Sequence, residues 1–76
     1  MQVEILTPET TLVSGEADIV TLPGANGSFQ VLDQHAPMIA NLGKGTVVVG
    51  SKQASEQFNV NGGLVEVLEN RVIVLV

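Results

Sequence analysis

Turn-forming residues divide this chain into short segments, and their spacing restricts the fold more than any other feature of the sequence. Clusters of Gly, Pro, Asn and Ser recur about every eight to twelve residues, which is the rhythm of a β-sandwich or barrel. Val, Ile and Thr supply 22 of the 76 residues, and β-branched side chains favour strands over helices. The spacing and composition predict one all-β domain over residues 1–76.

Alternation within the segments predicts which side chains face the core. Val3 and Ile5 share one face of a first strand, and Phe29 and Val31 share one face of another. The segment 36–41 is the only one expected to turn helically, for about a turn, because Pro37 suits a first helical position.

The last part of the chain predicts a hairpin with two apolar faces. Residues 64–68 and 71–76 flank Glu69-Asn70, and Asn tolerates the positive φ that a two-residue hairpin turn requires. If one face of this hairpin builds the core, the other must meet a second layer or a partner.

Composition favours a docking function over binding to polyanions. The chain is 45% apolar and 14% charged, against a usual charged share of about 25%. A domain this small cannot hide all of its apolar surface, and exposed apolar area usually marks an interaction site. With three cations against eight carboxylates, a net charge of -5, neither nucleic acid nor a lipid surface is an expected partner.

Two polar features suggest chemistry, and each has a simpler interpretation. His35, with Asp33 two residues before it, could act as an acid or base. The chain has no serine in a nucleophile elbow, however, so we interpret His35 as a residue that anchors a loop. Glu16 and Asp18 could hold a cation, yet calcium needs six to eight oxygens, so solvated charges are favoured. We therefore predict no catalytic, cofactor-binding or metal-binding residues.

Two short motifs containing glycine or lysine also have simpler interpretations. Residues 43–46 read Gly-Lys-Gly-Thr, but they lead into a strand rather than a helix, so a turn explains them better than a phosphate loop. Lys52, at a hairpin tip, leaves open a biotinyl or lipoyl carrier domain, although the flanking residues of those families are missing. The chain has no cysteine and no run of about 18 apolar residues, so a cytosolic, soluble chain is expected.

Several segments, in order along nearly the whole chain, resemble the N-terminal β-sandwich domain of the epsilon subunit of the F-type ATP synthase. They are Ile5-Leu6-Thr7-Pro8-Glu9, Leu12 to Ala17, Val20-Thr21-Leu22-Pro23-Gly24, Gly27 to Leu32 with His35-Ala36-Pro37, Phe58 to Val67, and Asn70 to Leu75.

The resemblance implies a ten-stranded sandwich of two five-stranded sheets and a place on the rotor of the ATP synthase. It implies a non-catalytic subunit that needs no cofactor, docks on the gamma subunit and the c-subunit ring, and couples ion-driven rotation to ATP synthesis. The expected location is the cytoplasmic face of the inner membrane, with membrane association only through the complex and no homo-oligomer. A free-standing β-sandwich interaction module is the alternative.

The family's contact regions map onto two stretches of this chain. The c-ring contacts correspond to Gly27, Ser28, Phe29, Gln30, Asp33 and His35, and the gamma contacts to Met38, Ile39 and Ala40.

This chain departs from the family pattern at several of these positions. Ser28 replaces the usual acid, so charge pairing with the ring is expected to weaken or to move to Asp33. Gln30 stands where glycine is usual, and Asp33-Gln34 replaces Pro-Gly. The family's C-terminal helical hairpin has no counterpart in these 76 residues, so its ATP binding and inhibition are not carried over.

Overall fold

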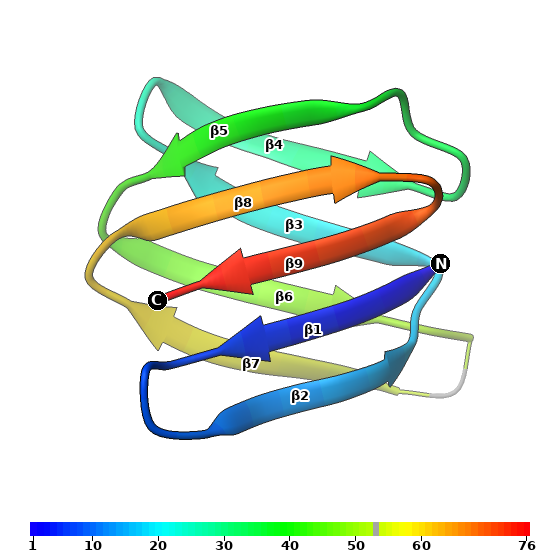
Figure 1. The fold of residues 1–76 in the computed structure, drawn as a ribbon, viewed down its shortest axis with the longest axis horizontal. Helices are drawn as coiled ribbons and strands as arrows, with labels where there is room; N and C mark the ends of the chain where they lie inside the picture. Colours follow the sequence, from blue (N-terminus) through cyan, green and yellow to red (C-terminus); the bar gives the residue numbers. More distant parts are fainter. Residues whose placement is uncertain (53) are drawn as a thin grey trace.

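The computed structural model describes residues 1–52 and 54–76, which form nine antiparallel or parallel β-strands in two packed layers (Figure 1). The first layer has the strand order β2 (Thr11–Glu16), β1 (Gln2–Leu6), β9 (Arg71–Leu75), β8 (Gly63–Leu68) and β5 (Met38–Leu42). The second layer contains β4 (Gly27–Leu32), β3 (Ile19–Gly24), β6 (Gly45–Gly50) and β7 (Ser55–Val60). The prediction of an all-β fold is confirmed.

The two layers are parts of one curled sheet. They are joined through β3 and β5 by a single pair, Gly24 with Leu42. The prediction of two five-stranded sheets is wrong in its count, because the described residues supply five strands to one layer and four to the other. On the side where β4 and β5 are the outermost strands, each pairs along its length on its inner edge only, and among the described residues its outer edge has no full-length partner.

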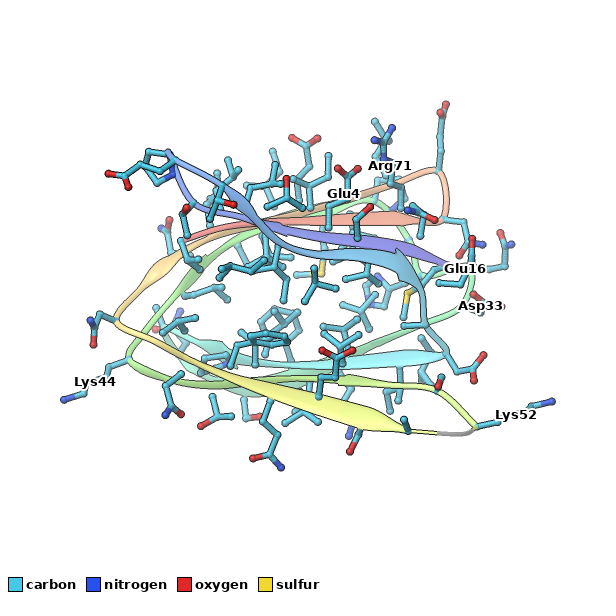
Figure 2. All side chains as sticks on the ribbon, turned by 90° about the horizontal axis from the view of Figure 1, so that it is seen from below. Glu4, Glu16, Asp33, Lys44, Lys52 and Arg71 are labelled. Atoms are coloured by element: carbon cyan, nitrogen blue, oxygen red, sulfur yellow. The ribbon has the colours of Figure 1, made fainter. Side chains whose placement is uncertain are left out.

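The space between the layers is filled almost entirely by aliphatic side chains, which Figure 2 shows pointing inward from both sides. The largest fully buried ones are Val3, Ile5, Val20, Leu22, Val31, Val47, Val65, Val67, Val72 and Val74. The alternation of buried and exposed residues predicted for the first strand and for β4 is therefore confirmed. Small β-branched side chains suit this space because they pack closely on a pleated surface with little rotamer entropy to lose.

The expected helical turn at 36–41 is wrong. Met38–Leu42 is strand β5 and pairs with β8 along its whole length. Pro37 fixes its own φ at a value that is compatible with a turn as well as with a helix start, so it does not decide between the two. Pairing with β8 decides, because an extended β5 turns Met38, Ala40 and Leu42 toward the core.

The predicted final hairpin is confirmed, and so is its turn. Leu68 pairs with Arg71 across Glu69-Asn70, and both turn residues have positive φ, 52° and 59°. Positive φ at both central residues is the geometry of a type I′ turn, whose twist matches that of the flanking strands.

Candidate interaction surfaces

The outer face of the five-stranded layer carries an apolar patch that no other part of residues 1–52 and 54–76 covers. Across the strands, Leu64 of β8 lies beside Leu75 of β9, which lies beside Leu6 of β1. We call these three residues, together with Ile73, Leu12 and Ile39, the outer apolar face. Leu75 is 47% exposed, Leu12 46% and Ile39 66%, so this face can still bury much apolar surface against a partner.

An ion pair borders the outer apolar face. The guanidinium of Arg71 on β9 bonds the carboxylate of Glu4 on the neighbouring strand β1, and Figure 2 shows the two side chains together on the outer side of this layer. Exposed pairs of this kind contribute about 1 kcal/mol or less to stability. The pair makes a polar rim beside an apolar centre, which is how interaction surfaces are usually organised.

The residues expected to touch the gamma subunit do not all face the same way. Ile39 points outward from β5, whereas Met38 and Ala40 alternate with it and pack against the core. Ile39 is therefore the one of these three that joins the outer apolar face. Met38 and Ala40 line a groove, to which Ile39 also contributes.

This groove, with a volume of about 340 Å³, lies between the β3–β4 turn, β4 and β5. It brings residues of both predicted contact stretches together, with Gly27 and Phe29 on one side and Met38, Ile39 and Ala40 on the other. All of its lining residues are uncharged, so it suits contact with apolar or neutral polar groups rather than with an anion or a cation.

The residues expected to touch the c ring lie along β4 and the connection that follows it. Gly27, Ser28 and Gln30 are exposed on β4, while Phe29 lies on the opposite face from Ser28 and Gln30 and is half-buried against the core. The side-chain amide of Gln30 reaches the hydroxyl of Thr21 on β3, 3.4 Å away. The outer side of β4 is therefore uncharged, with Ser28 and Gln30 as its polar side chains and Leu32 as an exposed apolar one.

The Asp33-Gln34 substitution for Pro-Gly keeps a tight turn at the end of β4. Gln34 has φ of 62°, a conformation that glycine adopts more readily. The backbone N–H of Gln34 donates to Oδ1 of Asn70 at 2.8 Å, and that of His35 donates to the carbonyl of Leu32 at 3.1 Å. The Asn70 side chain thus ties this turn to the β8–β9 turn.

His35 is a half-buried residue of this connection rather than part of a catalytic cluster. Its Nδ1 lies 2.7 Å from the carbonyl oxygen of Ala36, which fits the loop-anchor interpretation. Asp33 does not orient it, because the Asp33 carboxylate accepts a hydrogen bond from the N-terminal ammonium of Met1 at 2.6 Å.

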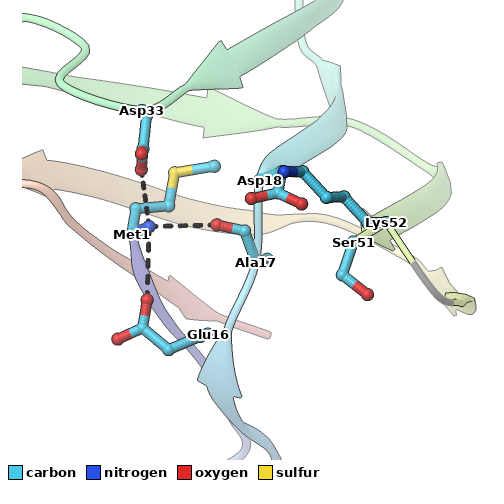
Figure 3. Close-up of a pocket in the computed structure, with 7 residues that line it drawn as sticks. All are labelled: Met1, Glu16, Ala17, Asp18, Asp33, Ser51 and Lys52. Carbon is cyan, nitrogen blue, oxygen red and sulfur yellow. Dashed lines mark hydrogen bonds and ion pairs between the residues drawn. The ribbon is translucent and has the colours of Figure 1, made fainter.

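The contact between Asp33 and the N-terminus belongs to a polar depression that the sequence did not indicate (Figure 3). The ammonium of Met1 also donates to the carbonyl of Ala17 at 3.0 Å and lies 3.4 Å from a carboxylate oxygen of Glu16. The hydrogen bond that the ammonium donates to Asp33 is the main reason that the pKa of the ammonium is raised, and the ammonium in turn lowers the pKa of Asp33. No local sequence signal could have revealed this cluster, because residues 1, 16 and 33 meet only in the folded chain.

The two acids that could have held a cation therefore behave differently. Glu16 lies against the ammonium, whereas Asp18 is exposed at the rim of the same depression. Among residues 1–52 and 54–76, no set of three or more acidic or imidazole side chains is arranged to hold a metal ion. The same residues contain no helix of the length and apolar character needed to cross a bilayer.

Lys52 is exposed in the connection between β6 and β7, as predicted. The next residue of that tip, Gln53, lies outside the described residues. The connection between Leu42 and Gly45 is a turn that leads into strand β6, so the Gly-Lys-Gly-Thr segment is not a phosphate loop at the start of a helix.

These features define a small β-sandwich with an exposed apolar face on one of its layers. Over residues 1–76 the sequence matches the family described as ATP synthase, Delta/Epsilon chain, beta-sandwich domain. The chain belongs to this family, and the predicted resemblance is confirmed.

Relatives named ATP synthase epsilon chain align with nearly the whole chain. The one from Sulfurimonas denitrificans is 44% identical over 77 residues, covering 100% of this chain and 59% of the relative. The one from Chlorobaculum tepidum is 44% identical over 73 residues, covering 95% of this chain and 83% of the relative. That from Leptospira borgpetersenii serovar Hardjo-bovis is 36% identical over 75 residues, covering 99% of this chain. The chain spans 59% of the length of this Leptospira relative.

Two solved structures share the fold at low sequence identity. A chain in the Tetrahymena thermophila mitochondrial ATP synthase central stalk and c ring superposes with a TM-score of 0.83 and 18% identity, covering 97% of this chain and 60% of its own. A chain in the Euglena gracilis mitochondrial ATP synthase gives a TM-score of 0.89 and 18% identity, covering 96% of this chain and 48% of its own.

Proposed function

We propose that this chain is a non-catalytic domain of the ATP synthase rotor, which docks on the gamma subunit and on the c-subunit ring and so helps to couple ion-driven rotation to ATP synthesis. The outer apolar face is the observation that carries this proposal. This chain has few charges, and the outer apolar face is a surface that only a partner can bury. As part of the assembled enzyme, the domain acts as a peripheral subunit on the cytoplasmic side of the membrane.

The gamma subunit is assigned to the outer apolar face together with the edge strand β5. Ile39 belongs to both and is 66% exposed, so it is the best single anchor. Met38 and Ala40 support β5 from the core side and form the wall of the groove beside it. Truncating an anchor at the centre of an interface costs far more than changing a residue at its rim.

The c ring is assigned to β4 and the β4–β5 connection, through Gly27, Ser28, Phe29, Gln30, Asp33 and His35. The exposed side of β4 offers hydrogen-bonding groups without charge. Asp33 is the only acid of this stretch, and its carboxylate is already paired with the N-terminal ammonium. Contact with the ring is therefore expected to depend on neutral hydrogen bonds more than on ion pairs.

Two matched substitutions test which layer meets gamma. Leu75→Asp places a charge in the outer apolar face, and Leu32→Asp places the same charge on the four-stranded layer, at a leucine of similar exposure, 55% against 47%. We expect Leu75→Asp to weaken binding to purified gamma subunit by at least about tenfold, the equivalent of 1.4 kcal/mol, and Leu32→Asp to leave it nearly unchanged. Equal losses in the two titrations would argue against the assigned face.

The same family membership weakens the carrier alternative. Lys52 is exposed at a hairpin tip, as a modified lysine must be, so the alternative has one supporting observation. Expression together with a biotin or lipoate ligase followed by intact-mass measurement should give the unmodified mass.

A further inference from the structure

The chain contains two Asn-Gly sequences, and the fold places them in different structural environments. They are Asn26-Gly27, in the turn between β3 and β4, and Asn61-Gly62, in the connection between β7 and β8. In such a pair the backbone nitrogen of the glycine can attack the side-chain amide carbon of the asparagine, because glycine has no side chain to block the approach. The attack is intramolecular, so its rate depends mainly on whether that nitrogen is free and can approach.

The amide nitrogen of Gly27 is engaged in the fold. Residues 25 and 26 form a hydrogen-bonded turn, and Gly27 pairs with Gly24 as the closing pair of the β3–β4 ladder. Ala25 is fixed as well, since its N–H donates to the carbonyl of Asn41 at 2.9 Å. Before Asn26 could react, the amide of Gly27 would have to break the hydrogen bond that closes the hairpin.

The amide nitrogen of Gly62 has no such bond. Asn61 and Gly62 lie between the two layers, in a connection whose flanking strands β7 and β8 do not pair with each other. Among the described residues, no backbone acceptor bonds the N–H of Gly62, and the exposed side chain of Asn61 makes no hydrogen bond. Gly62 has φ of 146°, a conformation open almost only to glycine.

The neighbouring connection can accommodate a new negative charge at this place. Leu42 pairs with Gly63 and Gly45 pairs with Val60, so the two connections between the layers, 43–44 and 61–62, run side by side. Lys44 stands in the first of them and is exposed. A carboxylate formed at residue 61 would thus arise next to a connection that carries a cation.

We propose that Asn61 is a site of spontaneous deamidation in the folded protein, while Asn26 is protected. The nitrogen of Gly62 forms a bond to Cγ of Asn61, the bond from Cγ to Nδ2 breaks, and ammonia leaves with the proton from the Gly62 nitrogen. Water then opens the resulting succinimide, giving either aspartate or isoaspartate at position 61. The isoaspartyl product lengthens the backbone by one methylene between residues 61 and 62, next to Gly63, where even an added Cβ would collide with the carbonyl oxygen of Leu75.

The test compares the two sites in one sample. The 76-residue protein is incubated in mildly alkaline buffer, folded in one arm and unfolded in urea in the other, and peptide mapping by mass spectrometry follows residues 26 and 61 with time. In urea we expect the two sites to react at similar rates. In the folded arm we expect Asn61 to react several-fold faster than Asn26.

Matched variants assign the mass change to its site. Asn61→Gln should abolish the fast phase in the folded arm, because ring closure from glutamine is slower, whereas Asn26→Gln should leave that phase intact. Folding to the same circular dichroism spectrum is checked for both variants, and peptide mapping of the wild type remains decisive if either misfolds. Equal rates at the two sites in the folded arm, or faster reaction at Asn26, would overturn the proposal.

Discussion

At the scale of single residues, the most consequential contact is the one between the N-terminal ammonium and Asp33. It joins the start of β1 to the connection between β4 and β5, two parts of the chain that belong to different layers. Glu16 adds a second, longer contact from the end of β2. The cluster fixes the connection that contains His35, which is part of the predicted ring contact.

This ion pair makes the stability of the 76-residue chain depend on pH in both directions. The hydrogen bond with the ammonium lowers the pKa of Asp33, so its contribution is present above the ordinary aspartate value of about 3.9 and is lost as the pH falls through the lowered value. The same bond raises the pKa of the ammonium, so its contribution is complete below about pH 8 and is lost as the pH rises through the raised value.

Asp33→Asn should therefore destabilise the protein most at pH values between about 4 and 8. Urea unfolding of the variant and the wild type across pH measures the difference, which should narrow toward both extremes. Asp18→Asn is the control, since Asp18 lies at the rim of the same depression but makes no contact with the ammonium. A difference that stays constant with pH would show that Asp33 acts through something other than this pair.

A second residue-scale prediction concerns the glycine at the start of β8. Gly63 has φ of 144°, and a Cβ added there would collide with the carbonyl oxygen of Leu75 on the paired strand. Gly63→Ala should destabilise the protein by about 3 kcal/mol or more, since backbone strain alone costs about 1–3 kcal/mol. Gly15→Ala is the matched control in β2, where the added Cβ meets no atom within 4 Å; a similar loss of stability there would contradict this explanation.

At the scale of elements, the sequence predicts local features well and long-range ones poorly. Val3 and Ile5 could be assigned to the core because alternation is a property of one strand. The Glu69-Asn70 turn could be predicted because turn chemistry depends on two adjacent residues. Strand β5 could not, because Pro37 permits both a helix start and an extended chain, and pairing with a strand about 25 residues later decides.

The candidate site shows the same division. The sequence pointed to Met38, Ile39 and Ala40, but only their alternation in β5 shows that Ile39 alone faces outward. The contact of Asp33 with Met1 depends on the closure of the two layers and has no counterpart in sequence spacing. The apolar surplus in the composition correctly predicted an exposed apolar face, although its row of Leu6, Leu64 and Leu75 became visible only through the strand register.

The final turn provides a prediction at this scale. Glu69 has φ of 52°, in the left-handed region that costs a residue with a Cβ about 1–2 kcal/mol. Glu69→Gly should remove that cost. The net stabilisation should be only about 1 kcal/mol, because glycine loses more conformational freedom on folding than other residues do. Glu69→Ala removes the carboxylate but keeps the strain, so it should give no such gain. If alanine stabilises as much as glycine in thermal melts, charge rather than backbone geometry is the cause.

At the scale of the whole molecule, half of the eight acidic residues gather at one end of the sandwich, apart from the outer apolar face. Glu16, Asp18, Asp33 and Glu69 lie at or near the end of the sandwich that holds the N-terminus. The outer apolar face lies instead across the broad side of the five-stranded layer, which also carries the Glu4–Arg71 pair and Glu66, whose cross-strand neighbours are Ile39 and Ile73. Docking through that broad side therefore needs contact area more than long-range attraction.

This separation predicts the thermodynamic signature of binding to gamma. Burial of the outer apolar face should give a negative heat-capacity change, measured by titration calorimetry at several temperatures. Leu75→Ser should make that change smaller because less apolar surface is removed from water, whereas Glu16→Gln, at the acidic end, should leave it unaltered. The affinity should also fall only slightly as salt is raised, since screening acts on exposed charges and not on apolar contacts. A steep loss of affinity with salt, together with a heat-capacity change that Leu75→Ser does not reduce, would move the interface to the acidic end of the molecule.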